Sequence, residues 1–253
     1  MTRNWFFAIR SNLHIVNNLE RPEDCKDIMY QVRPLYDSFR KQCLQLPVEK
    51  SVCADEQMVP FKGILSVKQY MQSKPCKWAI KIFILCGDSG ICYNFLIYKG
   101  STTEIDPARI KQFGLGVAIV ISLSNRLKGR YCLYFDNFFS TYNLNICAAG
   151  TVRLNRFANS PLLSDKEMAK NGLHTDEVSA DQKVVLMAAV IGSNFLGVGK
   201  KDEVERWDKT DKYIKVERPE VIKSYSKNMG GVDKLYQLVS YYRIMIKSRK
   251  WTL

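Results

Sequence analysis

Two apolar stretches separated by a short turn constrain the fold most strongly. In residues 78–85 (WAIKIFIL) large apolar side chains occur at alternate positions, and residues 91–98 (ICYNFLIY) form a second apolar run. Such runs are typical of β-strands. The tetrapeptide GDSG at residues 87–90 is rich in the residue types that allow tight turns. We therefore expect an antiparallel hairpin over this region.

The same tetrapeptide resembles the sequence around a serine-protease nucleophile and the triplet of an aspartic protease. A serine protease needs a histidine base, and neither His14 nor His174 lies in a context with a suitable partner. An aspartic protease needs a second such triplet, from the chain itself or from a dimer mate. Turn chemistry explains the four residues better than either protease class.

The remaining segments predict a mixture of helices and strands. Apolar residues at helical spacing extend from the N-terminus to about residue 47. The residue patterns predict strands at 51–61, 130–140, 151–153 and 183–192, and helices at 107–127 and from 219 to the end, with a break at Gly230-Gly231. The segment 200–218 is charged, and we expect it to be exposed. This order of elements predicts an α/β fold.

Composition excludes several classes of protein. The chain has 253 residues, of which 46% are hydrophobic and 11% aromatic, which argues against disorder and predicts one large domain or one domain with an insertion. The longest apolar runs, residues 117–123 and 184–191, fall far short of the ~20 residues that a bilayer requires, and no secretory signal is visible, so we expect no membrane association. The cysteines form no C-x-x-C pair, so we expect free thiols and no zinc site.

Positive charge predicts a polyanionic partner, with a merely basic surface as an equal alternative. The formal net charge is +13, which favours nucleic acid through phosphate neutralisation. Residues 61–84 lack acidic side chains, and Tyr70 and Trp78 are interleaved there with the lysines of a predicted DNA-contact strip: Lys62, Lys68, Lys74, Lys77 and Lys81. We expect Trp78 itself to be a core residue, because it shares a strand face with Ile80 and Ile82. A second basic cluster, for which a solvated helix end is the alternative, comprises Arg243, Lys247, Arg249 and Lys250.

Three aspartates each interrupt or end an apolar element. They are Asp55 in VCADEQMVPF, Asp136 in LYFDNFF and Asp233 in MGGVDKL. A buried, unpaired carboxylate is costly, so such residues are usually solvated, paired or bound to metal. The alternative for any one of them alone is an ordinary strand-end or turn carboxylate. If the three converge, divalent cations such as Mg²⁺ would relieve their repulsion, and two ions about 4 Å apart would support phosphoryl transfer.

Five motifs follow one another along the chain: SVCADEQMVPFKG, QSKPCKWAIKIFILCGDSG, YFDNFFS, GTVRLNR and YSKNMGGVDKLYQLVSYYR. This series resembles the successive motifs of the piggyBac transposase family, including its host-domesticated, transposable-element-derived members. The segments IRSNLHIVNN and MYQVRPLYDSF also resemble the helical region that precedes the family's catalytic domain. The resemblance implies an RNase H-like catalytic core, with a mixed sheet, flanking helices and an inserted domain.

The resemblance further implies a division of the chain and a catalytic site. Residues 1–47 would be a helical lead-in, part of a dimerisation and DNA-binding region, and residues 48–253 an RNase H-like DDD domain with an insertion at about 156–218. Asp55, Asp136 and Asp233 would be its catalytic and metal-binding residues, with Glu56 in support. The implied cofactor is Mg²⁺ or Mn²⁺ in a two-ion site, without any small-molecule cofactor.

The activity implied by the resemblance is cut-and-paste DNA transposition. A DNA strand is hydrolysed at the transposon end, and the freed 3′-hydroxyl attacks, first to form a hairpin and later to join a TTAA target. The implied partner is DNA and the implied location is the nucleus, while a homodimer is left open.

Three departures from the family pattern support an alternative, a domesticated or degenerate copy that binds DNA or chromatin without catalysis. Tyr236 stands where the family often has a further aspartate. The segment 141–153 is several residues shorter than its counterpart, and the chain ends without the remaining helical region and the cysteine-rich, zinc-binding tail. We therefore expect a truncated domain that retains its three aspartates, and the sequence leaves open whether it is an enzyme.

Overall fold

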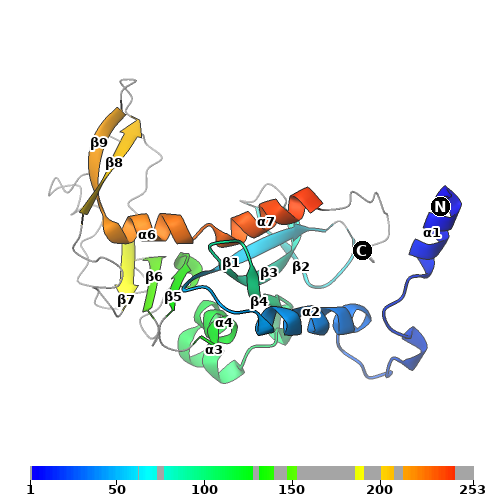
Figure 1. The fold of residues 1–253 in the computed structure, drawn as a ribbon. Helices are drawn as coiled ribbons and strands as arrows, with labels where there is room; N and C mark the ends of the chain where they lie inside the picture. The colour runs from blue at the N-terminus through cyan, green and yellow to red at the C-terminus, as the bar shows by residue number, and fades with distance from the viewer. Residues whose placement is uncertain are drawn as a thin grey trace.

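In the computed structural model, described for residues 2–61, 63–72, 77–127, 131–139, 147–152, 186–190, 201–207 and 213–242, a mixed sheet forms the centre (Figure 1). β1 pairs antiparallel with β3 and parallel with β5, β6 runs parallel beside β5, and β7 is antiparallel to β6. β2 and β4 both pair with the outer edge of β3. The seven strands of this sheet are β1 Ser51–Pro60, β2 Lys68–Tyr70, β3 Trp78–Gly87, β4 Cys92–Ile97, β5 Cys132–Phe135, β6 Cys147–Val152 and β7 Leu186–Val190.

Helices flank this sheet. In Figure 1, α6 and α7 cross one side of it, and α3 and α4 lie on the opposite side. The first two helices precede β1 in the chain. The α-helices of the described residues are α1 Arg3–Asn12, α2 Arg33–Gln45, α3 Pro107–Phe113, α4 Leu115–Ser124, α6 Glu220–Asn228 and α7 Gly231–Tyr242. None of them is long and apolar enough to cross a membrane.

The two faces of the sheet carry separate hydrophobic cores, because successive strand residues point to opposite sides. Phe83 of β3 packs with Ile119 of α4 on one face. The next residue, Ile84, packs with Tyr36 of α2 and Val232 of α7 on the other face. The α7 side is the face that carries the candidate site.

The predicted hairpin at residues 78–98 is confirmed as β3 and β4. The N–H of Gly87 donates to the carbonyl of Ile91 at 3.0 Å and closes the turn. The Glu49 carboxylate accepts hydrogen bonds from the Ser89 hydroxyl and from Tyr93 Oη, the latter at 3.0 Å. Burial alone would raise the pKa of Glu49, but these hydrogen bonds hold it below its usual range. Ser89 is therefore a structural turn residue.

Two predicted elements differ in the structure. The single helix expected at residues 107–127 is two helices, α3 and α4, because the chain takes a φ of +82° at Gly114, which no continuous helix allows. The charged segment at 200–218, for which no strand was predicted, forms a two-stranded hairpin of β8 Lys201–Trp207 and β9 Tyr213–Pro219. Glu203, Glu205 and Trp207 are exposed, so this face of β8 lacks the apolar residues from which a strand would be predicted.

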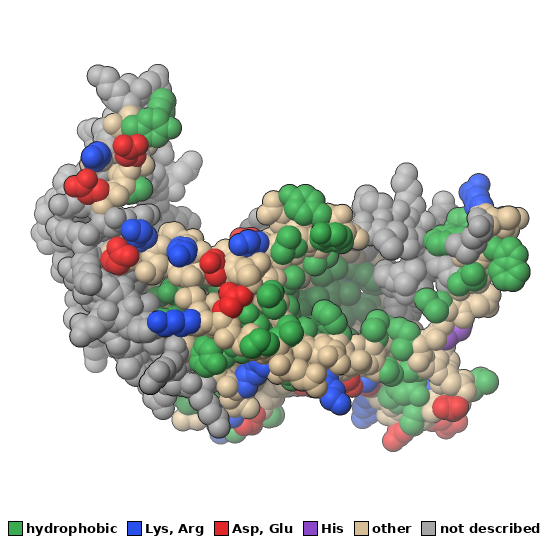
Figure 2. All heavy atoms as spheres, viewed as in Figure 1, with side chains coloured by type: hydrophobic (Ala, Val, Ile, Leu, Met, Phe, Trp, Pro, Cys, Tyr) green, Lys and Arg blue, Asp and Glu red, His purple; other side chains and the backbone are tan. Residues whose placement is uncertain are grey.

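Exposed apolar side chains gather on α1 and on the later turns of α7 (Figure 2). On α7 Val232 is 3% exposed, whereas Tyr241 and Tyr242 are 69% and 84% exposed. Val232 thus anchors the first turn of α7, Leu235 in the next turn is half-buried against the same core, and the end of the helix is exposed. The six cysteines whose thiols the structure describes form no disulfide: Cys25, Cys43, Cys53, Cys86, Cys92 and Cys132. The proposed division into lead-in, catalytic domain and insertion stays a prediction, and most of the insertion lies outside the described residues.

Candidate active site: three converging aspartates

Asp55 and Asp136 are placed by two neighbouring parallel strands. Ala54 of β1 is the register partner of Phe135 of β5, so the residues that follow them emerge side by side, on backbones about 5 Å apart. Asp136 directly follows β5, and its Oδ1 accepts a hydrogen bond from the Thr151 hydroxyl of β6 at 2.7 Å. Three adjacent strands therefore hold two of the predicted aspartates and orient one carboxylate.

Asp233 is placed by the beginning of α7, which lies directly on β1. The N–H groups of Gly231 and Val232 donate to the sulfur of Cys53. A Cβ atom on residue 231 would lie 2.8 Å from that sulfur, so only glycine permits this approach. Asp233 follows in the first turn, where the helix dipole favours a negative charge. The glycine pair predicted to break the helix thus brings the third aspartate to the sheet.

The pKa of Asp55 shows that the charges of the other two aspartates reach its carboxylate. Burial is the largest cause that raises it, and the negative charges of Glu56, Asp136 and Asp233 raise it further, to about 6. The N–H of Glu56, which donates to Asp55 Oδ1 at 2.7 Å, opposes this effect only in part. The structure therefore brings the three predicted aspartates into one electrostatically coupled group.

Two further residues join this group that sequence reasoning had missed. Burial and the negative charges of Asp136 and Asp55 raise the pKa of Tyr225 on α6 to about 12, and Tyr225 shares a hydrogen bond with Thr151. A chain of contacts thus runs from Tyr225 through Thr151 to Asp136. Both residues lie inside the motifs GTVRLNR and YSKNMGGVDKLYQLVSYYR, which is the signal that could have identified them.

Glu56, predicted in a supporting position, is engaged with Lys81. Their charged atoms lie 3.4 Å apart, and the two side chains are only 16% and 12% exposed. The Lys81 ammonium also lies 5.0 Å and 4.8 Å from the ring centroids of Phe83 and Phe138. Because Lys81 neutralises Glu56 internally, its predicted contact with DNA stays a prediction.

The basic strip is only partly visible. Lys77 is exposed, and the ammonium of Lys68 lies 4.8 Å from the ring centroid of Trp78. The expectation that Trp78 is a core residue was wrong, since its side chain is 49% exposed. Burial on its strand face falls from Ile84 toward the start of β3. The other predicted basic residues lie outside the described part of the chain: Lys62, Lys74, Arg243, Lys247, Arg249 and Lys250.

The chemistry of the donor set fits a hard divalent cation. Carboxylate oxygens are the ligands that Mg²⁺ and Mn²⁺ prefer, and a cation would relieve the repulsion that Asp136 and Asp233 exert on Asp55. Among the residues that the structure describes, no three His, Cys, Asp or Glu side chains are already arranged to hold a metal ion. The aspartates thus converge without forming a closed cage, and their metal-binding role stays a prediction.

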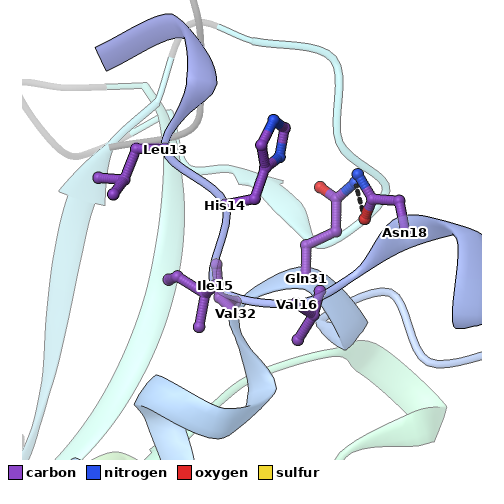
Figure 3. A pocket seen from close by; sticks show the side chains of 7 residues that line it. All are labelled: Leu13, His14, Ile15, Val16, Asn18, Gln31 and Val32. Carbon is purple, nitrogen blue, oxygen red and sulfur yellow. Dashed lines mark hydrogen bonds between the residues drawn. The ribbon is translucent and has the colours of Figure 1, made fainter. Parts of the chain in front are cut away.

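A separate pocket lies in the N-terminal segment, away from the aspartates (Figure 3). It is lined by residues 13–16, 18 and 31–32, and His14 is among the side chains that line it. The amide of Gln31 donates to Asn18 Oδ1 at 3.4 Å across it. The lining has no carboxylate, lysine or arginine, so it adds no charge chemistry to the site.

Comparison with known families places the whole chain in one of them. A family model described as "Transposase IS4" matches residues 1–253, the whole chain. The chain belongs to this transposase family. Human PiggyBac transposable element-derived protein 3 is 29% identical over 99% of the chain, and human PiggyBac transposable element-derived protein 2 is 27% identical over 98%. The chain spans 45% of the length of each. The resemblance to piggyBac transposases is thereby confirmed.

A solved structure supports the same assignment at the level of the fold. The cryo-EM structure of a piggyBac transposase synaptic complex with hairpin DNA matches with a TM-score of 0.69 and 22% identity, over 99% of this chain and 53% of that one. The predicted α/β fold, an RNase H-like core with a mixed sheet and flanking helices, is confirmed.

Proposed function

We propose that this transposase-family chain forms a metal-dependent core for DNA strand cleavage and transfer, in which Asp55, Asp136 and Asp233 hold Mg²⁺ or Mn²⁺. The observation that carries the proposal is the placement of Asp136 after β5 and of Asp233 at the start of α7, from where their charges act on the buried Asp55 carboxylate. Carboxylates that destabilise one another gain most from a shared divalent cation. DNA as the substrate is also consistent with the net charge of +13.

In this proposal the aspartates bind the metal ions, and neighbouring residues orient the aspartates. Two bound divalent ions would supply an activated water or 3′-hydroxyl and stabilisation of the leaving oxygen. Thr151 fixes the Asp136 carboxylate through its 2.7 Å hydrogen bond, and the close contact of Gly231 with Cys53 fixes the start of α7. Acting on DNA would place the protein in the nucleus, as the resemblance implies, and a homodimer remains compatible with this role.

Nicking of plasmid DNA tests this proposal without knowledge of a transposon-end sequence. The parent chain and an Asp136→Asn variant are incubated with supercoiled plasmid in Mg²⁺ or Mn²⁺. An Asp37→Asn variant is the matched control, because the Asp37 side chain is 60% exposed on α2, outside the group of aspartates. We expect nicking by the parent and by Asp37→Asn and its loss in Asp136→Asn. Equal nicking by all three proteins would mean that a contaminant cuts the plasmid.

The second candidate function is DNA or chromatin binding without catalysis. Tyr236, one turn after Asp233 on α7, is 46% exposed at the position where the family resemblance implies a further carboxylate. A copy without a carboxylate at this position would attract cations less strongly. In the same assay this candidate predicts no nicking by the parent, together with DNA binding that weakens as salt rises.

A further inference from the structure

An exposed pair of aromatic rings lies on the sheet edge formed by β2 and β3. Tyr70 and Trp78 are direct register partners, with ring centroids 4.9 Å apart. Both are about half exposed, at 52% and 49%. The Lys68 ammonium lies 4.8 Å from the centroid of the Trp78 ring, on the strand beside it. Two half-exposed rings thus lie beside the half-buried Lys68 ammonium, which also donates to the carbonyl of Gly63 at 2.9 Å. We call this arrangement the β2–β3 platform (Tyr70, Trp78 and Lys68).

The platform lies on the same face of the sheet as Asp55. Asp55 is the register partner of Ile84, and partners in an antiparallel pair point to the same face. Trp78 is six residues before Ile84 on β3, and an even separation along a regular strand keeps the face. At 3.4 Å per residue the two positions are about 20 Å apart. A DNA strand with a phosphate at the aspartates would cover this distance in about six nucleotides.

The charge around the platform favours an anionic ligand. Residues 61–84 contain no acidic side chain, and the neighbouring β1 residues Met58, Val59 and Pro60 are uncharged. Glu56, the next carboxylate along β1 toward the site, is already paired with Lys81. Aromatic rings flanked by cations are the means by which proteins hold single-stranded nucleic acid, because every base has a face that can stack.

We propose that unpaired bases of a DNA strand stack on the β2–β3 platform while Lys68 contacts its phosphate backbone. The inference rests on the proposed function in taking DNA as the substrate. It adds a binding site for a single-stranded or unpaired segment, at a position separate from the reacting phosphate. Bases within an intact duplex are stacked on one another, so the platform discriminates unpaired from paired DNA.

The chain offers a matched control for exposed aromatic residues. Trp207 and Tyr213, on the β8–β9 hairpin, are 57% and 68% exposed, with ring centroids also 4.9 Å apart. Unlike the platform, this hairpin carries acidic residues, among them Glu203 and Glu205. Trp207→Ala therefore removes a similar ring from a surface without the same charge.

The test measures binding of fluorescein-labelled oligo(dT) and of a blunt duplex of equal length, by fluorescence anisotropy in EDTA. We expect Trp78→Ala to weaken oligo(dT) binding roughly 5- to 100-fold, with duplex binding changed less than about twofold. Trp78→Phe and Trp207→Ala should bind oligo(dT) nearly as the parent does, and circular dichroism checks that each variant is folded. Oligo(dT) should also quench tryptophan fluorescence in the parent but much less in Trp78→Phe, which tests the contact without a destabilising truncation.

Two results would overturn the platform: unchanged oligo(dT) binding by Trp78→Ala, or an equal loss of single-stranded and duplex binding. The plasmid-nicking assay separates this outcome from failure of the proposed function. If nicking requires Asp136 but oligo(dT) binding is unchanged in Trp78→Ala, only the platform proposal is overturned. Binding that depends on Trp78 without any nicking would support the platform and count against catalysis.

Discussion

Replacing Asp55 with asparagine should make the metal-free protein more stable while it removes a carboxylate from the site. The pKa of Asp55 is raised to about 6 from an ordinary value near 3.9, a change of about two units. Each unit corresponds to 1.36 kcal/mol, so ionised Asp55 costs the folded state about 3 kcal/mol at neutral pH. Asparagine has nearly the same shape without the charge and avoids this cost.

The sign of this effect on stability follows from the different pKa of Asp55 in the folded and unfolded states. Between about pH 4 and pH 6 the folded state holds a proton on Asp55 that the unfolded chain has released, so this group's contribution to stability falls as pH rises through that window. The difference between Asp55→Asn and the parent should therefore be small near pH 4 and reach about 3 kcal/mol above pH 7.

Urea denaturation in EDTA, followed by circular dichroism at several pH values, measures this difference. Asp37→Asn is the control and should stay within about 0.5 kcal/mol of the parent, since its side chain is 60% exposed. Addition of Mn²⁺ should stabilise the parent, by about 2.7 kcal/mol at 100 times its Kd, and stabilise Asp55→Asn much less. An Asp55→Asn variant no more stable than the parent at neutral pH, or a difference independent of pH, would refute the reasoning.

Three further outcomes follow from the contacts around the site. Gly231→Ala places a methyl group 2.8 Å from a buried sulfur and should lower the free energy of unfolding by about 1–3 kcal/mol, measured in urea, with reduced plasmid nicking. Glu56→Gln leaves Lys81, which is 12% exposed, without its counter-charge and should cost roughly 3 kcal/mol in the same titration; an unchanged urea midpoint would contradict this. Glu49, whose pKa is lowered, contributes stability that is lost as pH falls below about 4, so Glu49→Gln should show a smaller acid-induced loss than the parent in thermal melts.

The sequence predicted those features whose causes are local. Residues 78–98 alternate and carry their own turn, and β3 and β4 form there as expected. Asp55 and Asp136 were identifiable because each is a charge within an apolar stretch, which is costly unless the residue has a partner or a function. Their convergence with Asp233, by contrast, depends on the packing of α7 on Cys53, which no local pattern encodes.

The features that the sequence did not predict depend on tertiary context. Trp78 shares the alternation of a core strand, yet burial on its strand face falls toward the start of β3, and its ring is half exposed. By helix propensity alone, Gly114 would only weaken a continuous helix. In the structure its positive φ separates α3 from α4. Thr151 and Tyr225 lie inside the family-like motifs, but their contact with the aspartate group depends on β6 and α6, which bring them to Asp136.

The most direct test of the central claim is calorimetric titration of Mn²⁺ into the parent chain and into Asp136→Asn, with Asp37→Asn as the control. If the three aspartates form one divalent-metal centre, the parent and the control bind with the same affinity, and Asp136→Asn loses most of that binding. Absence of binding in the parent, or equal binding in Asp136→Asn, would contradict the metal-dependent account and leave a transposase fold that contacts DNA without cutting it.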